Sequence, residues 1–275
     1  MRIIQLGGLG NQMFIYAYYY ALKKRGANVQ IDASLYNFLK MHNGYELPKV
    51  FEIEPADINL SGLYLQWLRF LLHFKPHLLI SEEIFEREDN IKLPKTPYIT
   101  GYWQSDLYFK EFSDEIRDLY TFKNISTKNR AVANHMQTIN SVSLHIRRGD
   151  YLTIPGALNV CSEDYYNKAI SIINRKVERP HFFIFSNDTA WSERFAKSLR
   201  IEYTIIDHNT GIDSYQDMYL MSQCKHNILA NSSFSWWGAY LNCHSDAIRI
   251  APYNWCNGHS AETLETDTPK NWLRI

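Results

Sequence analysis

The sequence predicts an α/β protein made of two Rossmann-like domains that face each other across a cleft. Strand-like and helix-like segments alternate through the second half of the chain, a pattern typical of a parallel sheet covered by helices. Both halves begin with a strand followed by a helix. The 275 residues are enough for two domains of about 130 residues each, and we place the boundary after residue 125, giving domains 1–125 and 126–275.

The composition excludes several classes of protein. Lys and Arg number 29, as do Asp and Glu, so no overall field favours nucleic acid or an anionic membrane. The chain enters its first strand without an apolar leader and has no run of 18 or more apolar residues, so we expect no membrane span. Four cysteines without C-x-x-C spacing indicate neither a disulfide framework nor a zinc site, so we expect a cytoplasmic protein.

The first half of the chain opens with a strand-helix-strand unit. A strand over residues 2–6 leads through the glycine loop GGLGNQ into a helix over 11–25, which Gly26 ends, and a strand over 29–32 follows. The middle, residues 34–123, is irregular and rich in proline. Its segment 62–80 is amphipathic, and two interpretations are open: a core helix, or a helix that contacts a membrane surface peripherally.

The second half is regular. A polar passage over 123–140 contains one helix and precedes the alternating elements. Strands are predicted over 141–146, 181–186, 202–206, 227–230 and 247–251. Helices are predicted over 162–177, 189–199, 213–224 and 234–243, the first with Ser162 as its N-cap.

Polar and glycine-rich segments follow the strands. In parallel sheets the carboxyl ends of the strands share one edge, where ligands bind, so these segments predict a site. They are Gly7–Gln12, Arg147–Asp150, Asn187–Asp188 and Asn231–Ser235. The glycine loop fits neither a dinucleotide fingerprint nor a Walker A motif, yet Gly8 and Gly10 let backbone N–H groups approach a ligand at a helix start.

Two helix starts and the pair Arg147 and Arg148 together indicate a bound diphosphate, because both kinds of group attract anions. The sequence contains no D-x-D pair to hold a divalent cation beneath it, and the histidines form no ligand cluster. We therefore expect guanidinium groups to neutralise the diphosphate, with no metal and no cofactor.

Four motifs taken together resemble the bacterial-type galactoside α-1,2-fucosyltransferases of glycosyltransferase family 11. They are GGLGNQMFIYA, GYWQSDLYF, HIRRGD and MSQCKHNILANSSFSWWGAYLN, and they span nearly the whole chain. The resemblance implies a GT-B fold, GDP-β-L-fucose as the donor substrate, a galactoside hydroxyl as the acceptor, inversion at the anomeric carbon and no metal. It makes 1–125 the acceptor-side domain and 126–275 the GDP-fucose-binding domain.

The resemblance also implies roles for individual residues. Arg147 would bind the β-phosphate, with Arg148 in support, and His145 would lie beside the nucleoside. Asp217 would read the guanine edge, where a carboxylate accepts from N1–H and N2–H2. The resemblance also places Asn11 near the reacting centre and Ser232, Ser233 and Phe234 in the phosphate loop. The polar segments after the strands add Asp188 and Asn231 to the donor side.

The expected mechanism is a single displacement in which Arg147 stabilises the charge on the departing GDP. For Asp150 two roles are open: it removes the proton of the acceptor hydroxyl, or it holds the arginine turn. Two roles are also open for Tyr102, Trp103 and Gln104: a platform for the acceptor sugar, or part of the core.

The leading hypothesis is therefore transfer of fucose to the 2-hydroxyl of a terminal β-galactoside in surface glycan synthesis, with a lipid-linked acceptor included. One alternative keeps the fold and changes the linkage or the sugar-nucleotide donor. Another is a non-catalytic glycan-binding protein, which leaves the arginines unexplained. The sequence does not define an oligomeric state.

Overall fold

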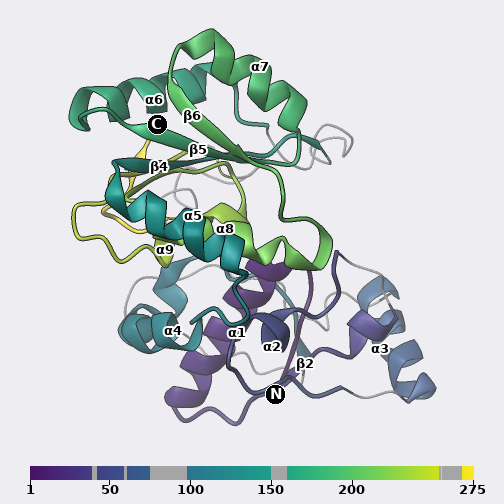
Figure 1. The fold of residues 1–275 in the computed structure, drawn as a ribbon. Coiled ribbons are helices and arrows are strands. Elements are labelled where there is room, and N and C mark those ends of the chain that lie inside the picture. The colour runs from purple at the N-terminus through teal and green to yellow at the C-terminus, as the bar shows by residue number, and fades with distance from the viewer. Residues whose placement is uncertain (39–41, 59–60, 75–97, 150–159, 254, 256–267) are drawn as a thin grey trace. The chain divides into compact units, whose positions relative to one another are not determined.

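The computed structural model describes residues 1–38, 42–58, 61–74, 98–149, 160–253, 255 and 268–275. The chain divides into an N-terminal unit, Met1–Lys123, and a C-terminal unit, Asn124–Ile275 (Figure 1). The division falls after Lys123, close to the boundary predicted after residue 125. Each unit contains a parallel sheet, so the predicted α/β class is confirmed.

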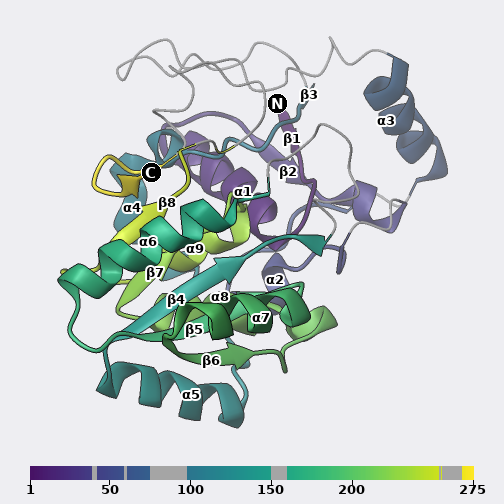
Figure 2. The same cartoon turned by 90° about the horizontal axis from the view of Figure 1, so that it is seen from above.

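The C-terminal unit is built on a six-stranded sheet with the order β6-β5-β4-β7-β8-β9, in which every neighbouring pair is parallel. Strands β4, β5 and β6 run side by side in Figure 2. The strands are β4 (Ser141–Ile146), β5 (His181–Ser186), β6 (Glu202–Ile206), β7 (His226–Ile228), β8 (Arg249–Ala251) and β9 (Leu273–Arg274). Strand β9 is an addition that the sequence pattern did not predict.

Helices cover both faces of this sheet, as the alternation of elements requires (Figure 1). One face packs on α6 (Glu163–Lys176) and α7 (Thr189–Leu199). The other packs on α5 (Thr127–Thr138) and α8 (Tyr215–Gln223), and α9 (Ser233–Tyr240) lies against α8. The short turn η6 (Gly211–Asp213) leads into α8. Strand β4 is buried along its whole length, because both of its faces are covered.

Helix α5 is the helix predicted in the interdomain passage, and it belongs to the core of the C-terminal unit. Its N-cap Ser126 accepts a hydrogen bond from the Asn129 N–H, and its residues Ala133 and Met136 pack with Phe183 of β5. The helix expected in this segment is therefore present, and it lies within the expected domain 126–275. Its polar composition reflects a helix with one exposed face.

The N-terminal unit has a three-stranded parallel sheet with the order β2-β1-β3, formed by β1 (Arg2–Ile4), β2 (Gln30–Asp32) and β3 (Tyr98–Ile99). Helix α1 (Leu9–Lys24) joins β1 to β2, as predicted. The other short helices are η1 (Ser34–Asn37), α2 (Leu47–Val50), η3 (Asp106–Tyr108), η4 (Lys110–Phe112) and α4 (Ser113–Leu119).

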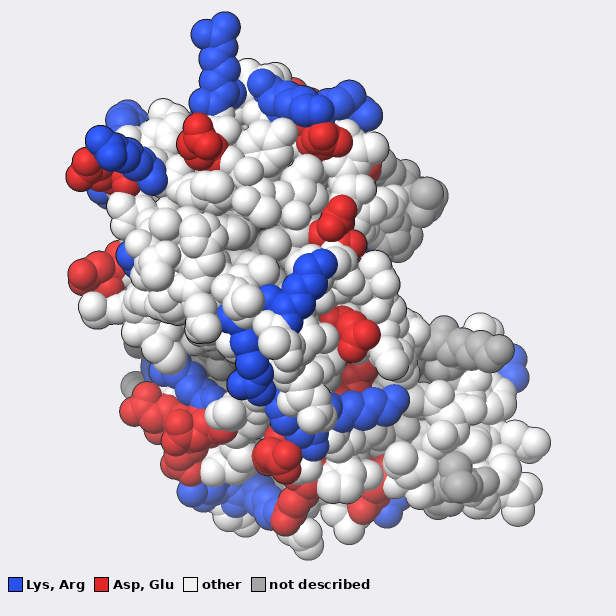
Figure 3. Space-filling view, in the orientation of Figure 1, with Lys and Arg blue, Asp and Glu red and all other residues white. Residues whose placement is uncertain are grey.

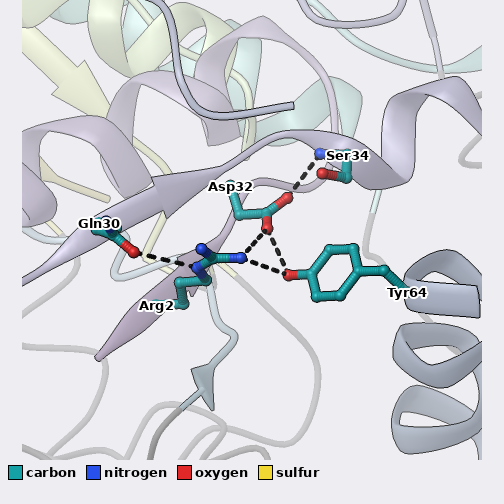
Figure 4. A network of polar contacts seen from close by, with 5 residues as sticks. All are labelled: Arg2, Gln30, Asp32, Ser34 and Tyr64. Atoms are coloured by element: carbon teal, nitrogen blue, oxygen red, sulfur yellow. Dashed lines mark hydrogen bonds and ion pairs between the residues drawn. The ribbon is translucent and has the colours of Figure 1, made fainter. Parts of the chain in front are cut away.

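A buried carboxylate ties helix α3 (Gly62–Phe74) to this sheet (Figure 4). Asp32, only 1% exposed, accepts hydrogen bonds from the Tyr64 hydroxyl at 2.5 Å and from the Ser34 N–H at 2.8 Å. The Arg2 guanidinium lies 3.5 Å from the same carboxylate and also bonds to Gln30. A buried charge is tolerable because these partners compensate for its desolvation.

Helix α3 also has an apolar face turned to solvent. Leu68 and Leu71 are buried, whereas Leu63 is 81% exposed and Trp67 and Phe70 are partly exposed. The structure thus contains the predicted helix over 62–74, and residues 75–80 lie outside the described residues. Within the described part of the chain, no helix is long and apolar enough to cross a membrane. Peripheral membrane contact stays a prediction.

Close packing of α9 on α8 makes Gly238 a sensitive position. A Cβ at this position would lie 2.7 Å from the Cβ of Met221, well inside van der Waals contact. We expect Gly238→Ala to destabilise the protein by about 1–3 kcal/mol through overpacking, measured as a lower midpoint in urea unfolding. Gly62→Ala is the matched control, since no atom lies within 4 Å of its Cβ. Equal midpoints for the two variants would contradict this account of the contact.

Candidate functional site

The C-terminal sheet has a topological switch point between β4 and β7. From β4 the chain moves outward to β5 and β6, then returns through α8 to β7 on the other side of β4. Connections leave the two strands in opposite directions there, and in such sheets ligands usually bind beyond the carboxyl ends of the strands at this point. Arg147 follows β4 and Ser232 follows β7, so the two predicted phosphate-binding segments lie after the two strands of the switch point.

His145, on β4, carries a buried nitrogen on the side of the sheet where α9 lies. Its side chain is 5% exposed, its ring lies 6.1 Å from the Phe234 ring of α9, and its Nδ1 has no hydrogen-bond partner. Burial, aided by the nearby charge of Arg147, lowers the pKa of His145 to about 3, so the imidazole is neutral. A buried polar atom left unsatisfied is costly, and a bound ligand is one explanation for it.

The two arginines after β4 have different environments. The Arg148 guanidinium lies 4.2 Å from the centre of the Trp191 ring on α7, and its Nε is 3.7 Å from an Asp188 oxygen. Arg148 is therefore held on the α7 side of the sheet. Alternation of side chains along an extended chain places Arg147 on the opposite side, with His145, whose pKa its charge lowers. The two arginines thus lie on different sides of the sheet, and a ligand-binding role for Arg147 stays a prediction.

Residues at the end of β5 hold the arginine turn in place. The Arg148 N–H donates to Asn187 Oδ1 at 3.0 Å, and a Cβ on Gly149 would lie 2.6 Å from Asn187 Nδ2. Asp188 caps helix α7 by accepting from the Trp191 N–H at 3.1 Å, in addition to pairing with Arg148. In the structure its carboxylate thus has two internal partners, and a donor-binding role for Asp188 stays a prediction.

The segment after β7 forms a helix start. Ser232 caps α9 by accepting from the Phe234 N–H, and this leaves first-turn N–H groups outside the helical bonding pattern, including that of Ser233. Asn231 is 3% exposed and used internally: its oxygen accepts from the Cys161 thiol, and its nitrogen donates to the Trp255 carbonyl. Ser232 and Ser233 therefore suit an anion, whereas Asn231 shapes the loop.

Asp217, in the first turn of α8, has the most perturbed carboxyl group of this edge. Burial raises its pKa to about 7, although a hydrogen bond from Asn209 Nδ2 at 2.8 Å favours the charged form. Asn209 follows β6 in the run Asp207-His208-Asn209, which the sequence interpretation did not include. The signal was present, since the other four segments were selected because they follow predicted strands.

The N-terminal unit repeats the same topological feature. Its central strand β1 pairs with β2 on one side and β3 on the other, and the loops after β1 and β3 meet. Gln104 Nε2 donates to Asn11 Oδ1 at 2.7 Å, and a Cβ on Gly7 would come within 3.2 Å of the Tyr102 ring. The structure thus brings together Asn11, Tyr102 and Gln104, which the sequence predicted from separate motifs.

The glycine loop is fixed by internal hydrogen bonds. The Gly7 carbonyl accepts from the Tyr36 hydroxyl at 2.6 Å and from Gln12 Nε2 at 3.1 Å. Gly8 caps α1 without a side-chain bond, and a Cβ there would lie 3.2 Å from the His42 ring. Gly10 lies inside the first turn of α1 and is buried.

A carboxylate already occupies the start of α1. Glu46 is 4% exposed, and burial raises its pKa, whereas a hydrogen bond from Asn43, the charge of Lys49 and the nearby Leu9 N–H lower it. A helix start that faces a carboxylate is a weaker site for a diphosphate, because both carry negative charge. The two predicted helix starts are therefore unequal, and that of α9 suits a phosphate better.

Other predicted residues fall outside an open site or outside the described residues. Trp103 is 5% exposed and stacks on Tyr18, so of the two roles open for it the structure shows the core one. Asp150 lies outside the described residues. In the described ranges no three His, Cys, Asp or Glu side chains gather as metal ligands would. On the face drawn in Figure 3, basic and acidic side chains are interspersed over both units.

Comparison with known proteins assigns the family. The family model of Glycosyl transferase family 11 matches residues 2–275. An alpha-1,2-colitosyltransferase from Escherichia coli is 32% identical over 98% of this chain and 96% of its own, and the O-antigen biosynthesis glycosyltransferase WbnK from Escherichia coli is 30% identical over 98% of each.

More distant relatives agree with this assignment. The galactoside alpha-(1,2)-fucosyltransferase 2 of Oryctolagus cuniculus is 24% identical over 90% of this chain and 68% of its own. The crystal structure of the fucosyltransferase NodZ from Bradyrhizobium matches at 13% identity with a TM-score of 0.50, covering 86% of this chain and 90% of that one, and shows the fold alone. The chain belongs to glycosyltransferase family 11 and has the GT-B fold.

Proposed function

We propose that the protein transfers L-fucose from GDP-β-L-fucose to the 2-hydroxyl of a terminal β-galactoside, with inversion, in the synthesis of a surface polysaccharide. The main observation in favour of a nucleoside-diphosphate donor is the switch point of the C-terminal sheet. There Arg147, the neutral buried His145 and the Ser232–Ser233 helix start lie at the carboxyl ends of β4 and β7. Family membership supports the glycosyl transfer.

The proposed reaction is one displacement. The bond between the anomeric carbon and the β-phosphate oxygen breaks, the acceptor oxygen forms the new glycosidic bond, and its proton passes to a base. Arg147 and first-turn N–H groups of α9 stabilise the negative charge that develops on GDP. These groups are positioned before the reaction begins, and they would serve in place of a divalent cation. For Asp150, proton removal and support of the turn both stay open.

The acceptor is proposed to meet the N-terminal unit through Tyr102, Gln104 and Asn11. Tyr102 is 39% exposed, so its ring offers an apolar face, and the bonded amides of Gln104 and Asn11 supply groups that recognise hydroxyls. We include lipid-linked oligosaccharides among the acceptors, and the exposed face of α3 as a region of peripheral membrane contact at the inner surface.

GDP-colitose is a second candidate donor, favoured by the 32% identity to an Escherichia coli colitosyltransferase. Colitose differs from fucose by the loss of one hydroxyl. A site that hydrogen-bonds this hydroxyl rejects the analogue by about 10⁴-fold or more, whereas an apolar pocket discriminates by about 10²-fold at most. Side-by-side transfer assays with both donors and several β-galactosides, in the presence of EDTA, test the proposal. Product NMR defines the linkage.

Arg147 is expected to dominate the rate. Arg147→Ala should lower kcat by about 10²–10³-fold, the usual cost of removing a preorganised charge stabiliser. Arg148→Ala should cost less than Arg147→Ala, because Arg148 acts through the turn that Trp191 and Asp188 hold. Arg179→Ala is the matched control, since that side chain is 93% exposed and its turn is remote from the switch point in sequence. Steady-state kinetics that show full activity in Arg147→Ala would reject the mechanism.

We expect the buried Asp217 carboxyl group to lower the free energy of unfolding at neutral pH, although it is the proposed recognition group for guanine. Its pKa is raised to about 7 in the folded protein, so the folded state holds its proton more tightly than the unfolded state. Stability is therefore lost as the pH rises from about 4 to about 7. Asn cannot ionise, so Asp217→Asn should be more stable than the parent protein at pH 8, with a smaller difference at pH 4.5, while its GDP affinity falls. Urea unfolding and calorimetric titration measure both effects, and a variant less stable at pH 8 would disprove the assignment.

A further inference from the structure

A polar cluster inside the C-terminal unit connects helix α5 to Asp217. Its centre is Asn129, which is fully buried and whose side-chain amide makes four hydrogen bonds. The nitrogen donates to Asn209 Oδ1 at 2.7 Å and to Gln216 Oε1 at 2.8 Å. The oxygen accepts from His208 Nε2 at 2.9 Å and from Asn209 Nδ2 at 3.3 Å. All the donor and acceptor positions of this amide are thus in use.

These bonds determine which way the Asn209 amide points. Because Asn129 Nδ2 requires an acceptor, the Asn209 oxygen faces Asn129, and the Asn209 nitrogen then faces Asp217 Oδ1 at 2.8 Å. The reversed amide would place its oxygen against the Asp217 carboxylate, where two acceptors repel each other. Among the described residues, no hydrogen bond to Asp217 Oδ2 is present. One carboxylate oxygen is therefore anchored internally, and the other is available to a ligand.

We propose that Asn209, held by Asn129, is a positioning residue that orients the Asp217 carboxylate and thereby sets selectivity for guanine. This inference rests on the proposed function, in which Asp217 accepts from guanine N1–H and N2–H2. A carboxylate accepts two parallel hydrogen bonds only if its plane matches that of the base. The single bond from Asn209 restricts rotation of that plane. It also favours the ionised form, which accepts from both guanine groups, in a buried position that disfavours charge.

The test compares GDP with inosine diphosphate, which lacks the 2-amino group of guanine. Isothermal titration calorimetry on the full chain should give at least about a tenfold preference of the parent protein for GDP, the value of one charge-assisted hydrogen bond. Asn209→Asp keeps the shape and removes the donor. We expect this variant to bind GDP and inosine diphosphate within about threefold of each other, mainly through weaker GDP binding.

Two further variants make the result specific. Asn140→Asp is the matched control: Asn140 also donates to a neighbour, the Glu178 carbonyl at 2.6 Å, but it precedes β4 at the opposite edge of the sheet. It should keep the preference of the parent protein. Asn209→Ser removes the bond without adding a charge, and it carries the test if thermal melting shows that Asn209→Asp does not fold.

The outcomes separate the inference from the proposed function. If Asn209 had a purely structural role, its substitution would weaken the binding of GDP and of inosine diphosphate by the same factor. The ratio of the two dissociation constants would then stay unchanged, and this result would overturn the inference. If the parent protein itself does not distinguish GDP from inosine diphosphate, the assignment of guanine to Asp217 fails, and the inference fails with it. The inference is supported if Asn209→Asp and Asn209→Ser lose the preference for GDP while the parent protein and Asn140→Asp keep it.

Discussion

The position of β4 at the centre of a parallel sheet is the constraint on which the C-terminal unit depends. Hydrogen-bonded strands lie on both sides of β4 and helices cover both faces, so its six residues are all buried. A strand so enclosed can present charge only beyond its ends, and the two arginines follow its carboxyl end. The same enclosure desolvates His145 and makes the imidazole neutral. The enclosure of β4 thus explains both the position of the candidate site and the neutral state of His145.

Much of the C-terminal unit was predictable from the sequence. The strands 141–146, 181–186 and 202–206 and the helix 189–199 lie where the sequence pattern placed them, because long periodic segments carry their own signal. Strand order was not predictable, since hydrogen bonds between distant segments decide it. For this reason the switch point, and the unequal positions of Arg147 and Arg148, appear only in the structure. The sequence shows two adjacent arginines, and Trp191 and Asp188 distinguish them.

In the candidate site, too, local sequence pattern predicted some features and tertiary contacts decided the others. Asn187 directly follows β5 and Ser232 lies four residues after the end of β7. Both were selected because they follow predicted strands, and their roles in a site stay predictions. Partner residues were not predictable, because Gln104 reaches Asn11 across 93 positions and Asn129 reaches Asn209 across 80. Trp103 shows the opposite error: an aromatic residue beside polar ones suggested a sugar platform, and stacking on Tyr18 buries it. Local pattern indicates that a loop is functional, and packing decides which of its side chains are accessible.

The Glu46 carboxylate at the start of α1 has a consequence for the division of labour within the family. Because the chain's own carboxylate lies at this helix start, the diphosphate of the proposed donor would rely on groups after residue 140. On the proposed function, mutations in the loops after β1 and β3 would then alter acceptor recognition without weakening nucleotide binding. On the proposed function, the N-terminal unit, Met1–Lys123, would then carry acceptor recognition and the C-terminal unit donor recognition.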